Sequence, residues 1–213
     1  MTPEIAFQGP RRGADRAVLL AHGAGGDMDA PALTTVADAL ADAGIPSARF
    51  RFPYRSAGRR APDRAPVLAA AVREAAARLA RRTGLPPARI VPGGRSMGGR
   101  VCSLVVADEE DPLPALGLVL LGYPLHPPGR PDRPRAEHFP RIRVPCLFVH
   151  GTRDAFATPA ELRAAARRIR GRVAWHWIDT ADHGFRPLRS SGRSPDDVLA
   201  DAAAAVVRFV AGC

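Results

Sequence analysis

Ten residues decide the fold of this chain: Val91-Pro92-Gly93-Gly94-Arg95-Ser96-Met97-Gly98-Gly99-Arg100. The apolar pair Ile90-Val91 leads into them, and an apolar pattern of helical spacing follows. Gly94 and Gly98 flank Ser96 in the pattern G-x-S-x-G. A serine on a sharp strand-to-helix turn needs small neighbours, because a Cβ there would clash across the turn. The helix that starts at such a turn points its backbone N–H groups at whatever Ser96 attacks.

Apolar runs alternate with helical patterns along the chain. Strands are expected at residues 17–21, 47–52, 89–91, 116–121, 144–149 and 173–177, and helices are expected to begin near residues 31, 66, 97, 159 and 195. Most of the runs are short and continuous, as in strands buried on both faces of a parallel sheet. We therefore expect an α/β fold with a mostly parallel, twisted sheet of about six to seven strands and helices on both faces.

Three segments carry further expectations. Residues 47–52 alternate apolar side chains with arginine, which is typical of a half-exposed edge strand. The polar residues 53–60 are expected to form a loop. Residues 123–140 are rich in proline and too few for a helical lid, so we expect a stiff surface loop and no cap domain. Residues 1–213 are expected to form a single domain.

The chain is strongly basic, with a formal net charge of +10. Its basic residues are arginines, and they are scattered along the chain instead of forming one stripe. A nucleic-acid binder, whose affinity would fall steeply with salt, is one alternative. The scatter favours a chain without a nucleic-acid partner.

Cysteine content and hydropathy indicate the cellular compartment in which the protein is expected. Three cysteines, Cys102, Cys146 and Cys213, are an odd number, and the first two fall in an expected helix and strand. They are expected to be thiols in a reducing compartment. Residues 1–12 lack the apolar core of a signal peptide, and no stretch reaches the roughly 20 apolar residues of a membrane span. We expect a cytoplasmic protein without a membrane partner.

Residues capable of catalysis follow several of the expected strands. These are His22–Gly26, Ser96, Tyr123–Gly129, Asp154 and His183. Because the carboxyl ends of parallel strands meet at one edge of a sheet, we expect these segments to converge there. A serine hydroxyl is a weak nucleophile unless a base takes its proton, histidine suits that task, and a carboxylate fixes the imidazole tautomer. The order Ser96, Asp154, His183 is the order found in α/β-hydrolases.

Other histidines and aspartates are alternatives for these roles. His22 and His150 are expected to hold turns, His176 to be structural in a strand, and His126 and His138 to lie in the proline-rich loop, within reach of substrate. His183 is favoured as the base because it follows the last strand with a glycine beside it. Asp179 and Asp182 are the alternatives to Asp154, but Asp182 is the sequence neighbour of His183, and a neighbour rarely reaches the next ring.

An oxyanion needs preorganised hydrogen-bond donors. The first expected donor is the backbone N–H of Met97, directly after Ser96, and the second is that of Ala24 in the loop after the first long strand. The alternative for His22–Gly26 is a plain tight turn. A dinucleotide fingerprint is excluded, because G-x-G-x-x-G counted from Gly23 would place its third glycine at Met28.

Five motifs together resemble the dienelactone-hydrolase-like branch of the α/β-hydrolase superfamily. They are His22-Gly23-Ala24-Gly25-Gly26, Gly94-Arg95-Ser96-Met97-Gly98-Gly99-Arg100, Gly122-Tyr123-Pro124-Leu125-His126-Pro127-Pro128, Gly151-Thr152-Arg153-Asp154 and Asp182-His183. More narrowly, the chain is similar to the small KANL- and Tex-type hydrolase-like proteins. Dienelactone hydrolases themselves carry a cysteine nucleophile where this chain has Ser96.

The resemblance implies a Ser96–Asp154–His183 triad and serine hydrolase chemistry without a cofactor or metal. We expect a small ester, thioester or related acyl compound as the substrate, and a monomer or homodimer. The alternative is a catalytically idle interaction module with this fold.

Several side chains are expected to contact that substrate. The expected substrate-binding residues are Gly23, Gly25, Arg95, Tyr123, Leu125 and His126. Arg95, Arg133 and Arg135 would suit an anionic substrate, although arginines at such places are ordinarily solvated.

Overall fold

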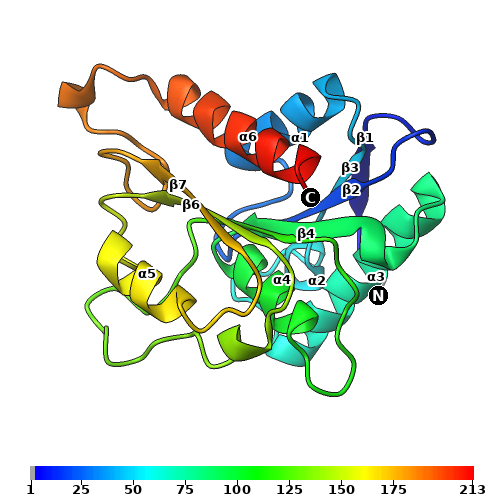
Figure 1. The fold of residues 1–213 in the computed structure, drawn as a ribbon, viewed down its shortest axis with the longest axis horizontal. Coiled ribbons are helices and arrows are strands. Elements are labelled where there is room, and N and C mark those ends of the chain that lie inside the picture. Colours follow the sequence, from blue (N-terminus) through cyan, green and yellow to red (C-terminus); the bar gives the residue numbers. More distant parts are fainter. Residues whose placement is uncertain (1–2) are drawn as a thin grey trace.

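The computed structural model describes residues 3–213, in which one seven-stranded sheet runs through the centre of the molecule (Figure 1). Residues 1 and 2 lie outside the described residues. They belong to the segment 1–12, which was expected to lack the apolar core of a signal peptide. The strands are β1 (Ile5–Gln8), β2 (Ala17–Ala21), β3 (Ser47–Phe50), β4 (Ile90–Arg95), β5 (Leu118–Leu121), β6 (Cys146–Gly151) and β7 (Val173–Ile178). The α-helices are α1 (Pro31–Asp42), α2 (Pro53–Ser56), α3 (Ala65–Thr83), α4 (Met97–Val106), α5 (Pro159–Ala166) and α6 (Pro195–Ala211).

The sheet has the order β1-β3-β2-β4-β5-β6-β7, and every neighbouring pair except β1 and β3 is parallel. The expected mostly parallel α/β sheet of six to seven strands is therefore confirmed. β4 lies at its centre, between β2 and β5. Its last residue, Arg95, directly precedes Ser96.

The expectation that residues 47–52 form an edge strand is wrong. β1 pairs antiparallel with β3 and takes the edge position instead. The arginines that suggested exposure are held by acidic partners: Arg49 by Asp29 at 2.9 Å, and Arg51 by Asp27 at 2.8 Å. Alternating charge therefore reflects these ion pairs and not an open edge.

Helices cover both faces of the sheet. α1 and α6 pack together on one face, and α3, α4 and α5 lie on the other (Figure 1). Each face has its own apolar core, so strands such as β2 and β5 are buried on both sides. Burial of this kind supplies most of the free energy that holds the layers together.

The helix boundaries follow the expected signals. α3 ends at Gly84, whose φ of +73° suits a glycine after a helix. α5 and α6 each begin with a capping box, formed by Thr158 with Glu161 and by Ser194 with Asp197. The expected loop at residues 53–60 is wrong in its first part, because Pro53 starts the short helix α2.

No cap domain covers the carboxyl edge of the sheet in residues 3–213. The proline-rich segment 122–138 contains no helix, and a single 3₁₀ turn follows at Phe139–Arg141. None of the described helices has the length and apolar character needed to cross a membrane. Cys102 and Cys146 are buried free thiols, and Cys213 is half-buried.

Candidate active site

The turn between β4 and α4 holds Ser96 in a strained conformation. Ser96 has φ +48° and ψ −115°, a region that L-residues rarely occupy. A Cβ on Gly94 would lie 2.1 Å from the Ala21 carbonyl oxygen, and one on Gly98 would lie 2.3 Å from the same atom. Both flanking positions therefore require glycine because the turn packs directly against the end of β2.

His183 bridges Ser96 and Asp154. Its Nε2 lies 2.9 Å from Ser96 Oγ, and its Nδ1 lies 2.7 Å from Asp154 Oδ2. A carboxylate can only accept a hydrogen bond, so Nδ1 carries the proton and Nε2 is free to accept from the serine hydroxyl. The three residues come from segments that follow β4, β6 and β7.

Asp154 is held as an ion by its neighbours. Its side chain is fully buried, and Oδ1 accepts a hydrogen bond of 2.8 Å from the Phe156 backbone N–H. Burial by itself raises the pKa of Asp154, but the hydrogen bond from His183 and the proximity of His150 outweigh it and lower that pKa. An ionised Asp154 can stabilise a positive charge on the His183 imidazole.

The turn that carries His183 is built by its neighbour Asp182. Asp182 Oδ1 accepts hydrogen bonds from the backbone N–H groups of Gly184 at 2.7 Å and Arg186 at 2.9 Å. Asp179 accepts from Thr152 and from a backbone N–H in the preceding turn. Neither alternative acid bonds the His183 ring.

Phe156 is a neighbour of the imidazole that the sequence did not reveal. Its ring lies 4.1 Å from the His183 ring, centroid to centroid, at a tilt of 30°. It follows Asp154 by two residues, so the same turn provides the acid and a wall for the ring. In the sequence Asp154-Ala155-Phe156, only the distance of two residues from Asp154 could have indicated that Phe156 contacts the His183 ring.

A second serine–histidine pair exists in the interior. Ser103 Oγ and His138 Nε2 are 2.8 Å apart, but these residues are 0% and 1% exposed. Ser103 Oγ also donates to the Arg100 carbonyl oxygen at 2.8 Å, so His138 Nε2 is the donor toward Ser103 and cannot act as its base. No carboxylate in residues 3–213 bonds His138 Nδ1. This pair is buried and structural.

The segment His22–Gly26 is fixed by side chains beneath it. His22 Nδ1 donates to the Gly23 carbonyl oxygen at 2.8 Å, and its Nε2 accepts from the Phe52 backbone N–H at 3.0 Å. Tyr54 Oη donates to the Ala24 carbonyl oxygen at 2.7 Å. His22 therefore holds this turn, as expected, and burial lowers its pKa.

The two expected oxyanion donors face one cavity. Ala24, Ser96 and Met97 all line it. Within residues 3–213 the Ala24 backbone N–H donates no hydrogen bond, and the N–H of Met97 is the first of α4, which has no partner inside the helix. Both groups are thus available to a ligand.

The expected substrate-binding residues are placed unequally. Gly23 lies against the nucleophile, because a Cβ on it would be 3.6 Å from Ser96 Cβ, whereas Gly25 is exposed and has nothing near its Cβ position. Arg95 turns away from the cavity. Its guanidinium donates to the Leu121 carbonyl oxygen at 3.3 Å and lies 4.8 Å from the centre of the Phe185 ring. Burial lowers the pKa of Arg95 to about 10.

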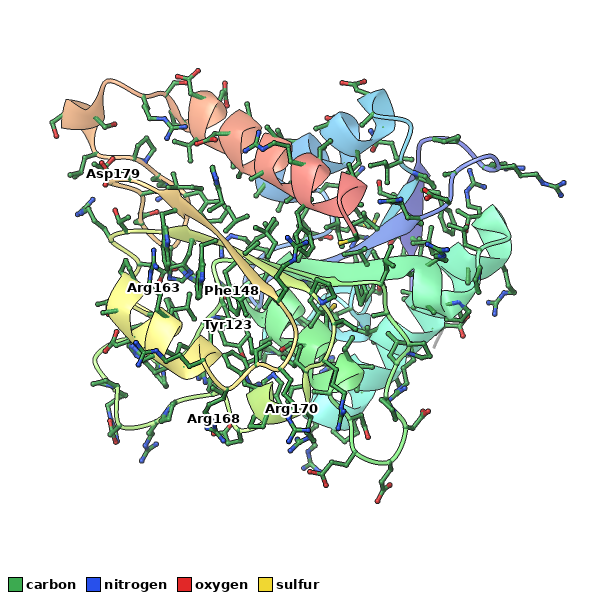
Figure 2. All side chains as sticks on the ribbon, in the orientation of Figure 1. Tyr123, Phe148, Arg163, Arg168, Arg170 and Asp179 are labelled. Carbon is green, nitrogen blue, oxygen red and sulfur yellow. The ribbon has the colours of Figure 1, made fainter. Side chains whose placement is uncertain are left out.

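Tyr123, Leu125 and His126 are buried in the protein interior and do not line this cavity. Tyr123 packs beside Phe148 under the sheet, with ring centroids 5.9 Å apart (Figure 2). His126 Nδ1 bonds the carbonyl oxygen of its neighbour Pro127 at 2.8 Å. The placement of these three residues gives no support to direct contact with substrate, because apolar neighbours and short loop contacts enclose them.

The cavity beside Ser96 has a volume of about 980 Å³ and runs between the start of α3 and the face of α4. Pro124, Arg100 and Arg135 line it, and of these three the sequence suggested only Arg135 as a contact for an anionic substrate. Arg100 follows Ser96 by one helical turn, a spacing that places both residues on one face. No group of three or more His, Cys, Asp or Glu side chains in residues 3–213 is arranged to hold a metal ion.

Residues 14–211 match the alpha/beta hydrolase domain. The chain belongs to the alpha/beta hydrolase family. This membership places it among the hydrolases of the α/β-hydrolase superfamily.

Solved structures of other α/β-hydrolases share the architecture. A serine hydrolase homologue from Coxiella burnetii is 20% identical with a TM-score of 0.69, and 98% of each chain is covered. Dienelactone hydrolase from Anabaena variabilis is 20% identical with a TM-score of 0.69, covering 99% of this chain and 89% of that one. Est1E from Butyrivibrio proteoclasticus, solved with ferulic acid, is 14% identical with a TM-score of 0.76, covering 99% and 94%. At these identities the likeness concerns the fold alone.

Proposed function

We propose that this alpha/beta hydrolase cleaves a small ester, thioester or related acyl compound through a covalent acyl-enzyme on Ser96. The observation that carries the proposal is the continuous chain of two hydrogen bonds, 2.9 Å and 2.7 Å long, from Ser96 through His183 to Asp154. Its nucleophile end lines the cavity. These lengths suit general-base catalysis without rearrangement.

The reaction proceeds in two steps, formation of the acyl-enzyme and its hydrolysis. Ser96 Oγ attacks the carbonyl carbon while its proton moves to His183 Nε2, and the negative oxygen meets the N–H groups of Met97 and Ala24. The imidazolium then gives the proton to the departing alcohol or thiol as the carbon–heteroatom bond breaks. Water repeats the sequence on the acyl-enzyme, releases the acid and restores Ser96.

The absence of a cap in residues 3–213 supports a short or flexible acyl compound over a long lipid. We also propose that residues 1–213 act as one catalytic domain, since the three reacting side chains come from segments around a single sheet. The free thiols of Cys102 and Cys146 are compatible with a reducing, cytoplasmic setting, which we propose as well.

Steady-state hydrolysis of p-nitrophenyl butyrate tests this function. Ser96→Ala is expected to lower kcat by roughly 10³-fold or more, because triad members act as a unit. Asp154→Asn is expected to lower it by roughly 10²–10⁴-fold by allowing the wrong imidazole tautomer. Ser103→Ala is the matched control, since that serine lies in α4, the helix that begins directly after Ser96, and also bonds a histidine.

The controls separate catalysis from folding. Ser103→Ala should keep kcat within about threefold of wild type, because Ser103 lies outside the cavity. Circular dichroism of each variant checks that the fold persists. A wild-type protein that turns over neither esters nor thioesters, yet co-purifies stoichiometrically with a partner, would instead favour the idle interaction module.

A further inference from the structure

The cavity beside Ser96 is lined by several charged side chains, both acidic and basic. Four acidic side chains line it, and three of them are neutralised by arginines: Asp63 by Arg59, Asp108 by Arg73 and Glu109 by Arg141. The fourth, Glu110, is exposed and lies in the turn after α4, away from the nucleophile end of that helix. Arg100 and Arg135 also line the cavity, and in residues 3–213 neither forms an ion pair or donates a hydrogen bond from its guanidinium.

Arg100 belongs to the first turn of α4, the helix that begins directly after Ser96, and both residues line the cavity. Its backbone N–H donates to the Ser96 carbonyl oxygen at 3.1 Å, so the two residues are one turn apart. Helical side chains lean toward the N-terminus of their helix, which brings Arg100 over the turn that starts at Ser96. Its Nε is buried without a hydrogen-bond partner. Residues 3–213 therefore supply no partner for this N–H, which has a free-energy cost.

Arg135 is held rigidly on the other side of the cavity. Its backbone N–H donates to the Leu125 carbonyl oxygen at 2.6 Å, and its carbonyl oxygen accepts from Tyr123 Oη at 2.7 Å. Leu125 and Tyr123 are themselves buried, so they fix the loop that carries the arginine. Burial, followed by the charge of Arg100, lowers the pKa of Arg135. Arg100 and Arg135 line the same cavity as Ser96.

Two arginines that line one cavity and have no acidic partner in residues 3–213 can bind an anion. The spacing between Ser96 and Arg100 limits where the anionic group can lie in the substrate. Ser96 and Arg100 are one helical turn apart, about 5.4 Å along the axis, and both line the cavity, so an anion bound by Arg100 can belong to the same small molecule as the carbonyl that Ser96 attacks. A carboxylate at the end of a short acyl chain fits this distance, whereas the phosphates of an acyl-CoA lie far along its pantetheine arm.

We propose that Arg100 and Arg135 bind a carboxylate on the acyl part of the substrate, so that the preferred substrate is a half-ester or half-thioester of a short dicarboxylic acid. This assignment rests on the proposed acyl transfer at Ser96. It replaces Arg95 and Arg133 as the expected anion contacts, because Arg95 is turned inward and Arg133 is exposed outside the cavity.

A matched pair of substrates tests the proposal: mono-p-nitrophenyl adipate and p-nitrophenyl hexanoate, which have equal chain length and differ in a terminal carboxylate. Wild type is expected to prefer the adipate in kcat/KM. Arg100→Gln and Arg135→Gln should each lower kcat/KM for the adipate roughly 10- to 100-fold, mainly through KM, because a charged hydrogen-bond partner is lost. The rate with the hexanoate should stay within about twofold. Arg133→Gln is the control in the same loop and should change neither.

Binding of adipate itself to the Ser96→Ala variant separates this proposal from the proposed function. Calorimetry should detect adipate binding that disappears when Arg100→Gln and Arg135→Gln are combined with Ser96→Ala and that weakens as salt is added. Adipate binding without any esterase activity in wild type would overturn the hydrolase function and leave the anion site standing. Equal kcat/KM for both esters in wild type, or arginine variants that lose both esters alike, would overturn the anion site.

Discussion

His138 shows how a single residue can resemble part of an active site and still act only in stability. Burial, then the charges of Arg100 and Arg141, lowers the pKa of His138 to about 3. The residue is therefore neutral in the folded protein at every pH where the fold is ordinarily studied. Its role is to fill the interior between α4 and the proline-rich loop and to hold Ser103.

The lowered pKa of His138 predicts a loss of stability in mild acid. Below about pH 6.5 the unfolded chain protonates this histidine and the folded chain does not, so the free energy of unfolding falls by about 1.4 kcal/mol for each pH unit until the folded pKa is reached. Urea unfolding near pH 6.5 and near pH 5 should show that wild type loses about 2 kcal/mol more than His138→Gln between the two. Equal losses in both proteins would contradict the assignment.

Residue types and their order in the sequence predicted that Ser96, Asp154 and His183 meet, as their hydrogen bonds show, but did not indicate the proposed anion pair. Ser96, Asp154 and His183 follow strands, lie beside glycines or turns and keep a known order, so several independent signals agree. Arg100 has only its spacing from Ser96, and a solitary arginine on a helix is most often solvated. Its missing acidic partner is a property of the folded cavity, and no local pattern in the sequence encodes it.

At the scale of elements, the strand–turn–helix unit around Ser96 depends on close backbone contact. α4 starts against the end of β2, and Gly98 is the point of contact, since a Cβ there would lie 2.3 Å from the Ala21 carbonyl oxygen and 2.6 Å from that of His22. Neither contact can be relieved by a side-chain rotation, because both atoms belong to the backbone. The helix would have to move away from the sheet.

We expect Gly98→Ala to lower the free energy of unfolding by roughly 2–4 kcal/mol and to abolish esterase activity by displacing Ser96. Gly25→Ala is the matched control, because nothing lies within 4 Å of its Cβ position and its φ is not positive. It should cost only a few tenths of a kcal/mol. Urea unfolding of the three proteins measures both effects, and a Gly98→Ala protein as stable as the control would show that the packing is looser than the distances indicate.

Helices and strands were predicted correctly where one periodic pattern dominated the sequence. The prediction failed where a strand forms only by pairing with another strand. β2 and α3 were recognisable because an apolar run and a long apolar helix face end at clear turn signals. β1 was missed because its four residues, Ile5–Gln8, become a strand only by pairing with β3. Because β1 pairs with β3, β3 lies inside the sheet and not at its edge. The arginines that alternate with its apolar residues suggested an exposed strand, but they are held in ion pairs.

At the scale of the whole molecule, the parallel sheet brings together side chains that are far apart in sequence. Ser96 and His183 are separated by 87 positions and still lie in hydrogen-bond contact. The strand order places the turns after β4, β6 and β7 at one edge of the sheet, where these side chains meet. The sequence could predict the convergence because carboxyl ends of parallel strands share an edge, but it could not predict which side chains fill the cavity beside them.

Labelling with a fluorophosphonate, followed by peptide mass spectrometry, tests the central claim most directly. The reagent phosphonylates only a serine that is activated by a base. We expect one modification, on the peptide that contains Ser96, with none after Ser96→Ala and unchanged labelling after Ser103→Ala. Labelling that persists in Ser96→Ala, or that maps to Ser103, would contradict the assignment of Ser96, His183 and Asp154 as the catalytic triad.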